Sequence, residues 1–224
     1  MFGEIASRYD FLNHLLSAGI DRRWRRRTTQ LAPLREGGTV LDVCTGTGDL
    51  ALAYWRSGGG RTEVVGADFC RPMLEIGLAK VRRAGADDKI SLVEADAEHL
   101  PFENDRFEIV SVAFGLRNIS DTDLGLREMA RVCRPGGRVV VLEFSMPRSK
   151  LIQEVYKRYF RRLLPLVGQA LAKNKQEAYN YLPASVEEFP QDEALAQRFR
   201  GAGLKDVCYR RLTFGVATLY MGVK

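Results

Sequence analysis

The chain has 224 residues, 46% hydrophobic and 28% charged, a composition that excludes a disordered protein and fits one domain, residues 1–224, with a full core. Charges interrupt every apolar run within about ten residues, which excludes a membrane span of roughly twenty. The formal charge of +6 and the pI near 9.2 favour an anionic partner such as RNA, a membrane surface or an acidic substrate.

Buried strands and helices alternate along the first two thirds of the chain. We predict strands at residues 39–44, 63–68, 90–94, 107–114 and 137–144, because each is a short apolar run. Helical spacing of apolar residues separates them at 49–56, 73–83 and 124–132, and residues 133–138 (CRPGGR) are expected to stop the last of these helices before the next strand. This order predicts a doubly wound α/β sheet with helices on both faces.

The last segment, residues 205–223, breaks this alternation. It contains two strand patterns joined by a turn near Gly215, with no room for a helix, so the two strands must pair antiparallel. The resulting seven-stranded, mostly parallel sheet with an antiparallel last strand is that of a class I S-adenosylmethionine-dependent methyltransferase. A dinucleotide-binding fold has six parallel strands instead.

A glycine loop at residues 41–50 (LDVCTGTGDL) follows the first strand. Gly46, Gly48 and Ala51 satisfy the loose dinucleotide fingerprint, and Asp68 stands about twenty residues further on, where a ribose-binding acid belongs. Asp49, however, begins the next helix, where it would repel a pyrophosphate. S-adenosylmethionine has no phosphate and carries a sulfonium and an ammonium, so the acids Asp42 and Asp49 suit it better.

Acidic residues lie in or just after each of the first three strands. Asp42, Asp68 and Asp96 are expected to serve the methionine ammonium, the ribose hydroxyls and the adenine amino group in turn. The alternative is that Asp42 and Asp96 only cap turns, as aspartate often does.

Seven segments together resemble one enzyme family. They are residues 5–13 (IASRYDFLN), 24–26 (WRR), 41–51 (LDVCTGTGDLA), 95–102 (ADAEHLPF), 114–121 (FGLRNISD), 128–137 (EMARVCRPGG) and 142–147 (LEFSMP). In this order they resemble the ubiquinone and menaquinone biosynthesis C-methyltransferases, the demethylmenaquinone methyltransferase family. The glycine loop and RPGG occur in many methyltransferases, whereas FGLRN with LEFSMP is specific to this family.

The resemblance implies S-adenosylmethionine as cofactor, S-adenosylhomocysteine as product, and no metal. Carried over by position, the cofactor contacts fall on Thr47 in the loop, on Asp68, and on Asp96 with Ala97. A serine often precedes FGLRN in the family, and this chain has Ala113 there, so one polar contact is in doubt.

The reaction implied is methyl transfer to a ring carbon of a reduced polyprenyl quinol, with demethylmenaquinol to menaquinol the favoured step and the benzoquinol step of ubiquinone biosynthesis a second. Such a carbon reacts once the quinol hydroxyl is deprotonated. Arg117 is expected to stabilise the phenolate or orient a water that Asn118 holds. Tyr9 is a third candidate for the catalytic site. The alternatives are that Arg117 pairs with Asp121 or Asp123 and that Tyr9 only packs.

Two helical segments are expected to cover the site: N-terminal lid helices at residues 1–30 and a substrate-covering insertion at 148–190. Residues 150–168 are expected to form an amphipathic basic helix. Its basic side suits an anionic membrane surface, so we expect a cytoplasmic protein in peripheral contact with the inner face of the membrane. The alternative is that the apolar side packs on the sheet or covers the substrate tail, while the basic side is only solvated. No nucleic acid partner is expected, and the sequence leaves a homodimer open.

Three other function classes compete with this interpretation. The run RRWRRR at 22–27 suits an RNA methyltransferase, although an amine-methylating one would carry Asn-Pro-Pro-aromatic where this chain has FGLRN. A dinucleotide-dependent oxidoreductase is disfavoured by Asp49 and by the terminal hairpin. A non-catalytic cofactor-binding protein gives no reason for FGLRN.

Overall fold

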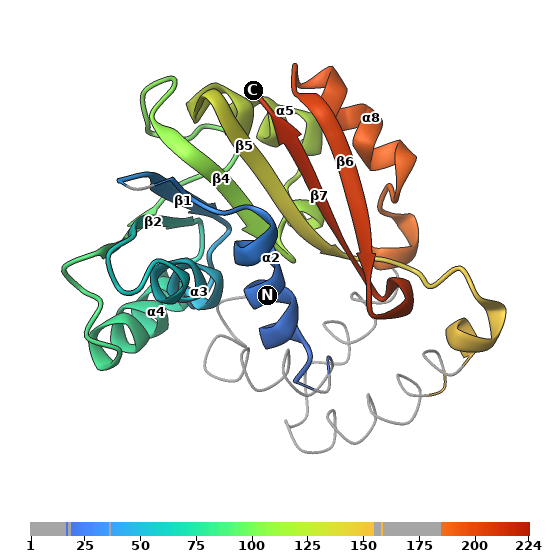
Figure 1. Ribbon diagram of the computed structural model, residues 1–224, viewed down its shortest axis with the longest axis horizontal. Helices are drawn as coiled ribbons and strands as arrows, with labels where there is room; N and C mark the ends of the chain where they lie inside the picture. Colours follow the sequence, from blue (N-terminus) through green and yellow to red (C-terminus); the bar gives the residue numbers. More distant parts are fainter. Residues whose placement is uncertain (1–16, 18, 36, 155–157, 159–184) are drawn as a thin grey trace.

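A seven-stranded sheet forms the centre of the computed structural model, which describes residues 17, 19–35, 37–154, 158 and 185–224 (Figure 1). Its strands are β1 (Thr39–Val43), β2 (Glu63–Asp68), β3 (Ile90–Glu94), β4 (Phe107–Ala113), β5 (Cys133–Phe144), β6 (Lys205–Leu212) and β7 (Ala217–Val223). The order across the sheet is β3-β2-β1-β4-β5-β7-β6. Strand β7 alone runs opposite to the other six strands, which confirms the predicted fold class.

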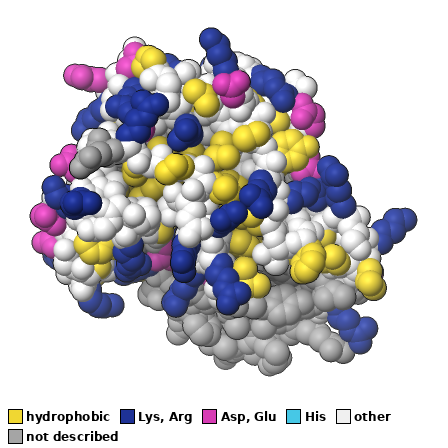
Figure 2. All heavy atoms as spheres, in the orientation of Figure 1, with side chains coloured by type: hydrophobic (Ala, Val, Ile, Leu, Met, Phe, Trp, Pro, Cys, Tyr) yellow, Lys and Arg dark blue, Asp and Glu magenta, His cyan; other side chains and the backbone are white. Residues whose placement is uncertain are grey.

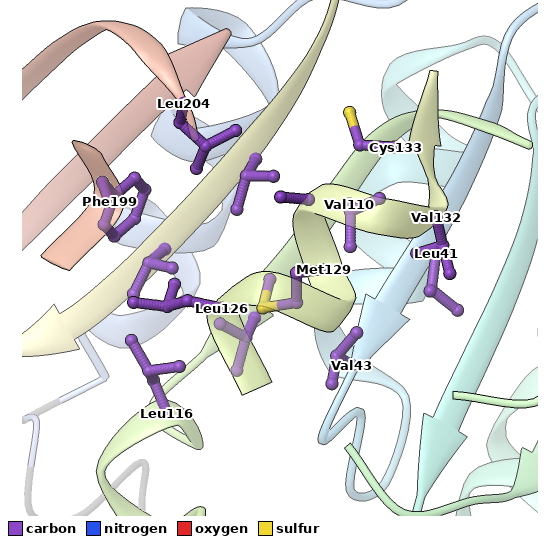
Figure 3. Close-up of a cluster of buried hydrophobic side chains, with 14 of the residues drawn as sticks. Leu41, Val43, Val110, Leu116, Leu126, Met129, Val132, Cys133, Phe199 and Leu204 are labelled. Atoms are coloured by element: carbon purple, nitrogen blue, oxygen red, sulfur yellow. The ribbon is translucent and has the colours of Figure 1, made fainter. Parts of the chain in front are cut away.

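Helices cover both faces of the sheet because side chains alternate along each strand. On one face, Val40 of β1 packs in a core with α2 (Asp21–Leu31), α3 (Asp49–Ser57) and α4 (Arg71–Arg83). On the other, Leu41 and Val43 pack with α5 (Thr122–Val132) and α8 (Glu193–Gly201). Figure 3 shows this second core, in which Met129 of α5 lies beside the strand residues.

The predicted stop of the helix before residue 133 is confirmed, but the predicted start of the next strand at residue 137 was wrong. Helix α5 ends at Val132 as expected, but β5 begins at the next residue, Cys133, which pairs with Phe107 of β4. The ladder then jumps from Cys133 to Arg138, so the residues between them bulge, and Gly136 turns with a φ of +73°. The other strands and helices predicted between residues 39 and 132 match the observed ones to within two residues at their ends.

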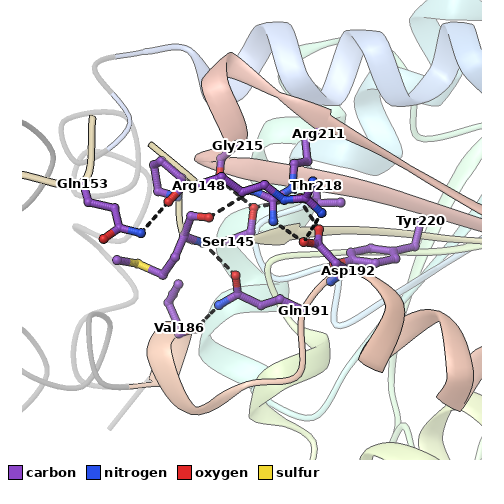
Figure 4. A network of polar contacts seen from close by, with 12 residues as sticks. Ser145, Arg148, Gln153, Val186, Gln191, Asp192, Arg211, Gly215, Thr218 and Tyr220 are labelled. Carbon is purple, nitrogen blue, oxygen red and sulfur yellow. Dashed lines mark hydrogen bonds and ion pairs between the residues drawn. The ribbon is translucent and has the colours of Figure 1, made fainter. Parts of the chain in front are cut away.

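A polar network ties the end of β5 to the β6–β7 hairpin (Figure 4). Asp192 is ion-paired with Arg211 of β6 and with Arg148, the latter at 3.2 Å, and its backbone N–H donates to the Tyr220 hydroxyl of β7 at 2.7 Å. Ser145, just after β5, donates to the carbonyl of Gly215 in the turn. The network therefore anchors the chain on both sides of the predicted 148–190 insertion.

Much of the predicted covering structure lies outside the described residues. This holds for residues 1–16 of the lid, and so for Tyr9, and for most of the 148–190 insertion, including most of the basic helix at 150–168. Of the lid, α2 is described and packs against α3. In the part of the chain that the structure describes, no helix combines the length and apolarity needed to cross a bilayer.

Candidate cofactor-binding site

A pocket of about 320 Å³ opens at the carboxyl edge of the sheet, where parallel α/β sheets bind their ligands. Five residues predicted from the sequence line it: Gly46, Asp68, Asp96, Ala97 and Asn118. Apolar side chains supply much of the remaining wall, among them Phe69, Met73, Leu100, Phe114 and Ile119. The structure thus brings together residues from four separate strand ends, as the fold predicted.

Asp68 ends β2 and holds the glycine loop. Its Oδ2 accepts the Gly46 N–H at 2.7 Å and its Oδ1 accepts the Cys70 N–H at 2.8 Å. Burial raises the pKa of this carboxyl above its usual value, while the two N–H donors act in the opposite direction. Each carboxylate oxygen keeps a further lone pair, so Asp68 is able to accept two ribose hydroxyls without releasing the loop.

Asp96 combines both of the roles considered for it. Its Oδ1 accepts the Glu98 N–H at 2.9 Å, so Asp96 caps a turn, which was the alternative role predicted for it. The side chain also lines the pocket together with Ala97, and it is about half exposed, at 51%. A local turn therefore presents Asp96 to the pocket.

A second, smaller hollow adjoins the pocket at the glycine loop, because Cys44 and Gly46 line both. Its wall holds Asp42, Thr47 and Ala113 from the predicted set, together with Arg25 and Asp49. Gly48 lines neither hollow. It caps α3 with a φ of +79°, the left-handed conformation that glycine adopts at little cost, and so turns the loop into the helix.

Asp42 is buried in β1, with only 1% of its surface exposed. Thr45 Oγ1 donates to it at 2.7 Å and Ser111 Oγ at 3.3 Å. Burial raises its pKa to about 7, the hydrogen bonds and the positive charge of Arg25 acting in the opposite direction. The group therefore titrates near neutrality and would favour a ligand cation once ionised.

Asp49 is the first residue of α3, as predicted, but a cationic side chain lies next to its carboxylate. Lys80 of α4 is ion-paired with Asp49 and donates to Thr47 Oγ1 at 3.0 Å. The argument that Asp49 repels a pyrophosphate is therefore weaker than the sequence suggested. The strand order is the stronger evidence against a dinucleotide-binding fold.

Arg117 lies beside the pocket rather than in its wall. Its Nη1 donates to Glu143 Oε1 at 2.6 Å and to the Phe114 carbonyl at 2.8 Å, while its Nε donates to Ser185 Oγ at 3.3 Å. The ion pair is buried, with side-chain exposures of 8% for Arg117 and 1% for Glu143. The alternative prediction of an ion pair for Arg117 is thus confirmed in kind, but its predicted partner, Asp121 or Asp123, was wrong.

Sequence reasoning missed two charged residues next to the site, Glu143 and Arg25. Glu143 has a signal in the sequence, since it is the one charge in an otherwise apolar run (VVVLEF) that was predicted as a buried strand. Arg25 was grouped with its neighbours in RRWRRR, and only the packing of α2 separates it from them.

The chain is similar in sequence to a family model and to named proteins of the same family. The sequence model described as the ubiE/COQ5 methyltransferase family matches residues 1–224. A protein of Geobacter sulfurreducens named ubiquinone/menaquinone biosynthesis C-methyltransferase UbiE is 47% identical over 100% of this chain and 87% of its own length. One of the same name from Pseudomonas aeruginosa is 43% identical with the same coverage.

Solved structures show the same fold at low sequence identity. A SAM-dependent methyltransferase from Aquifex aeolicus superimposes with a TM-score of 0.64 at 18% identity, over 88% of each chain. Phosphoethanolamine N-methyltransferase 2 of Haemonchus contortus, in complex with S-adenosyl-L-methionine, has a TM-score of 0.63 at 15% identity over 88% of this chain and 50% of its own. The chain therefore belongs to the ubiE/COQ5 methyltransferase family.

Proposed function

We propose that this protein transfers a methyl group from S-adenosylmethionine to a ring carbon of a reduced polyprenyl quinol in quinone biosynthesis. We take demethylmenaquinol as the first acceptor and the benzoquinol of ubiquinone biosynthesis as the second. The observation that carries the proposal is the identity of 42–47% over the full chain to proteins named for this C-methylation. The pocket is compatible with it, because apolar side chains and Asn118 line the wall beside the cofactor acids.

The lining residues fit the methyl donor chemically. Asp68 has lone pairs for the ribose, Asp96 and Ala97 stand where the adenine edge belongs, and Asp42 is an acid in the adjoining hollow for a cationic group. When bound, S-adenosylmethionine supplies an electrophilic methyl group on a sulfonium. What the protein has to add is an oriented acceptor, and such positioning lowers a barrier by several kcal/mol, up to about 10.

The acceptor also has to lose a proton, since a phenol titrates near pKa 10 and carbon is a weak nucleophile without the phenolate. We propose that Arg117 stabilises that phenolate. Within the described residues its Nη2 makes no hydrogen bond, so two N–H donors remain for an acceptor oxygen. Glu143 holds the guanidinium in place, and Asn118, in the pocket wall, is proposed to hold the acceptor hydroxyl or a water. Tyr9, which lies outside the described residues, remains a proposed third residue of the catalytic site.

We further propose a cytoplasmic protein that contacts an anionic membrane surface, from which its lipophilic acceptor comes. Figure 2 shows lysine and arginine side chains scattered over one face of the molecule. Arg22, Arg23 and Arg27 of α2 are exposed, and Leu151 and Phe214 are large apolar side chains at 75% and 79% exposure. Each cation near such a surface adds up to about 1 kcal/mol to the free energy of membrane binding.

Liposome binding tests this contact. We expect the protein to co-sediment with anionic liposomes and this binding to weaken as salt is added, whereas equal binding to neutral liposomes would contradict the electrostatic contact. A homodimer stays a prediction for analytical ultracentrifugation.

The acceptor is tested by competition. Demethylmenaquinol and the demethylated benzoquinol, both chemically reduced and present together, are incubated with methyl-labelled S-adenosylmethionine, and the products are identified by mass spectrometry. We expect the label chiefly in the naphthoquinol. A labelled benzoquinol as the main product would exchange the two acceptors, and no labelled product from either would refute the proposed function.

A further inference from the structure

Helix α2 separates one arginine from the rest of the basic run at residues 22–27. Trp24 and Arg25 are buried, at 3% and 8% exposure, whereas Arg22, Arg23, Arg26 and Arg27 are exposed. The Trp24 indole N–H donates to Thr213 Oγ1 at 2.8 Å, which pins the helix to the hairpin turn. Because the helix is held in this orientation, Arg25 has to face the interior of the protein.

The surroundings of Arg25 hold its guanidinium in one place. Nη1 is hydrogen-bonded and ion-paired to Asp21, one turn earlier in the helix, and Asp21 in turn accepts a hydrogen bond from Ser17 Oγ at 2.8 Å. The guanidinium carbon lies 5.4 Å from the centre of the Phe114 ring. Among the described residues, Asp21 is its only hydrogen-bond acceptor, so several of its five N–H donors remain for a ligand.

Arg25 lines the smaller hollow together with the acids Asp42 and Asp49 of the glycine loop. Of the described residues that line either hollow, it is the only one with a cationic side chain. The nucleoside of S-adenosylmethionine belongs at Asp68 and Asp96 in the larger pocket, so its amino-acid portion extends across Gly46, which both hollows share. That portion carries an ammonium, for which Asp42 is available, and a carboxylate, for which the loop offers no side-chain cation.

We propose that Arg25 binds the α-carboxylate of the methionine portion of S-adenosylmethionine, and that Asp21 positions the guanidinium for this contact. The hollow then receives the two opposite charges of an amino acid, with an acid on β1 for one and an arginine on α2 for the other. The proposal depends on the methyl donor and not on the identity of the acceptor. It gives α2 a role in the site that is separate from any contact with lipid.

The test compares two ligands that differ only in this carboxylate: S-adenosylhomocysteine and its decarboxylated analogue. Calorimetric titration needs neither quinol nor turnover, so its outcome is separate from that of the proposed function. Arg25→Gln is expected to weaken S-adenosylhomocysteine about tenfold or more, the loss of a charge-assisted hydrogen bond, and to leave the analogue unchanged. Arg26→Gln, one residue further along and exposed, is the matched control and should change neither affinity.

Equal losses for both ligands, or no loss for either, would show that Arg25 is only a structural partner of Asp21 and overturn the proposal. Because Arg25→Gln removes the cation that is ion-paired with buried Asp21, the double variant Asp21→Asn/Arg25→Met provides a second test that removes both charges. It should bind the two ligands with equal affinity. A double variant that still prefers the carboxylate-bearing ligand would overturn the proposal as well.

Discussion

Replacing Asp68 by alanine should weaken the binding of S-adenosylhomocysteine more than any other single change in the larger pocket. The substitution removes the acceptor for the ribose, and hydrogen bonds to a charged group contribute about 1.5–3 kcal/mol, equivalent to about 10- to 150-fold in affinity. The structure indicates that the tenfold loss of affinity is a minimum. The same carboxylate accepts the Gly46 and Cys70 N–H groups, so its loss also leaves two loop donors without an acceptor.

Calorimetric titration measures this loss directly. Asp68→Asn keeps one carbonyl acceptor and should fall between the wild type and Asp68→Ala. Glu94→Ala is the matched control: Glu94 pairs with Asp68 across β2 and β3 but lies outside the pocket wall, so its removal should not change the affinity. A dissociation constant of Asp68→Ala equal to that of the wild type, with thermal unfolding also unchanged, would refute the assignment of the ribose site.

Three further outcomes are expected. Ionised Asp42 favours the ligand ammonium, and the pKa of Asp42 is about 7, so the affinity for S-adenosylhomocysteine should rise up to about tenfold from pH 6 to pH 8. Asp42→Asn should abolish this rise, and a wild-type affinity that does not depend on pH would contradict the prediction. Arg117→Lys should lower kcat far more than the affinity for S-adenosylhomocysteine, since Lys keeps a charge beside Glu143 but has no planar fork; collapse of the affinity with kcat preserved would make Arg117 a binding residue. Gly77→Ala should lower both the melting temperature and the affinity, because its Cβ would lie 2.8 Å from the Leu92 side chain and 3.2 Å from the Thr47 backbone, an overpacking cost of about 1–3 kcal/mol; an unchanged melting temperature would show that α4 shifts freely.

The fold could be predicted because its evidence is local. Strands such as Ile90–Glu94 are short apolar runs between turn residues, and the terminal hairpin leaves no room for a helix. The start of β5 could not be predicted in the same way. CRPGG contains the usual signals of a loop, and only the pairing of Cys133 with Phe107 across the sheet makes it part of a bulged strand.

The site could be predicted only in part. The sequence indicates acids at the ends of strands, and the fold places Asp68 and Asp96 at one pocket. Which of five arginines in α2 faces inward depends on how the helix packs, although Trp24 and the four-residue spacing of Asp21 and Arg25 were available as signals. The partner of Arg117 likewise depends on tertiary structure, because Glu143 lies 26 residues further along the chain, on β5.

The position of the transferred methyl group tests the central claim most directly. Reduced demethylmenaquinone is incubated with S-adenosylmethionine bearing a trideuterated methyl group, and the product is analysed by mass spectrometry with fragmentation and by NMR. The account predicts one trideuterated methyl group on a ring carbon, formed with the reduced acceptor and not with the oxidised quinone. A trideuterated methyl ether on a quinol oxygen, or equal labelling of the oxidised quinone, would contradict it.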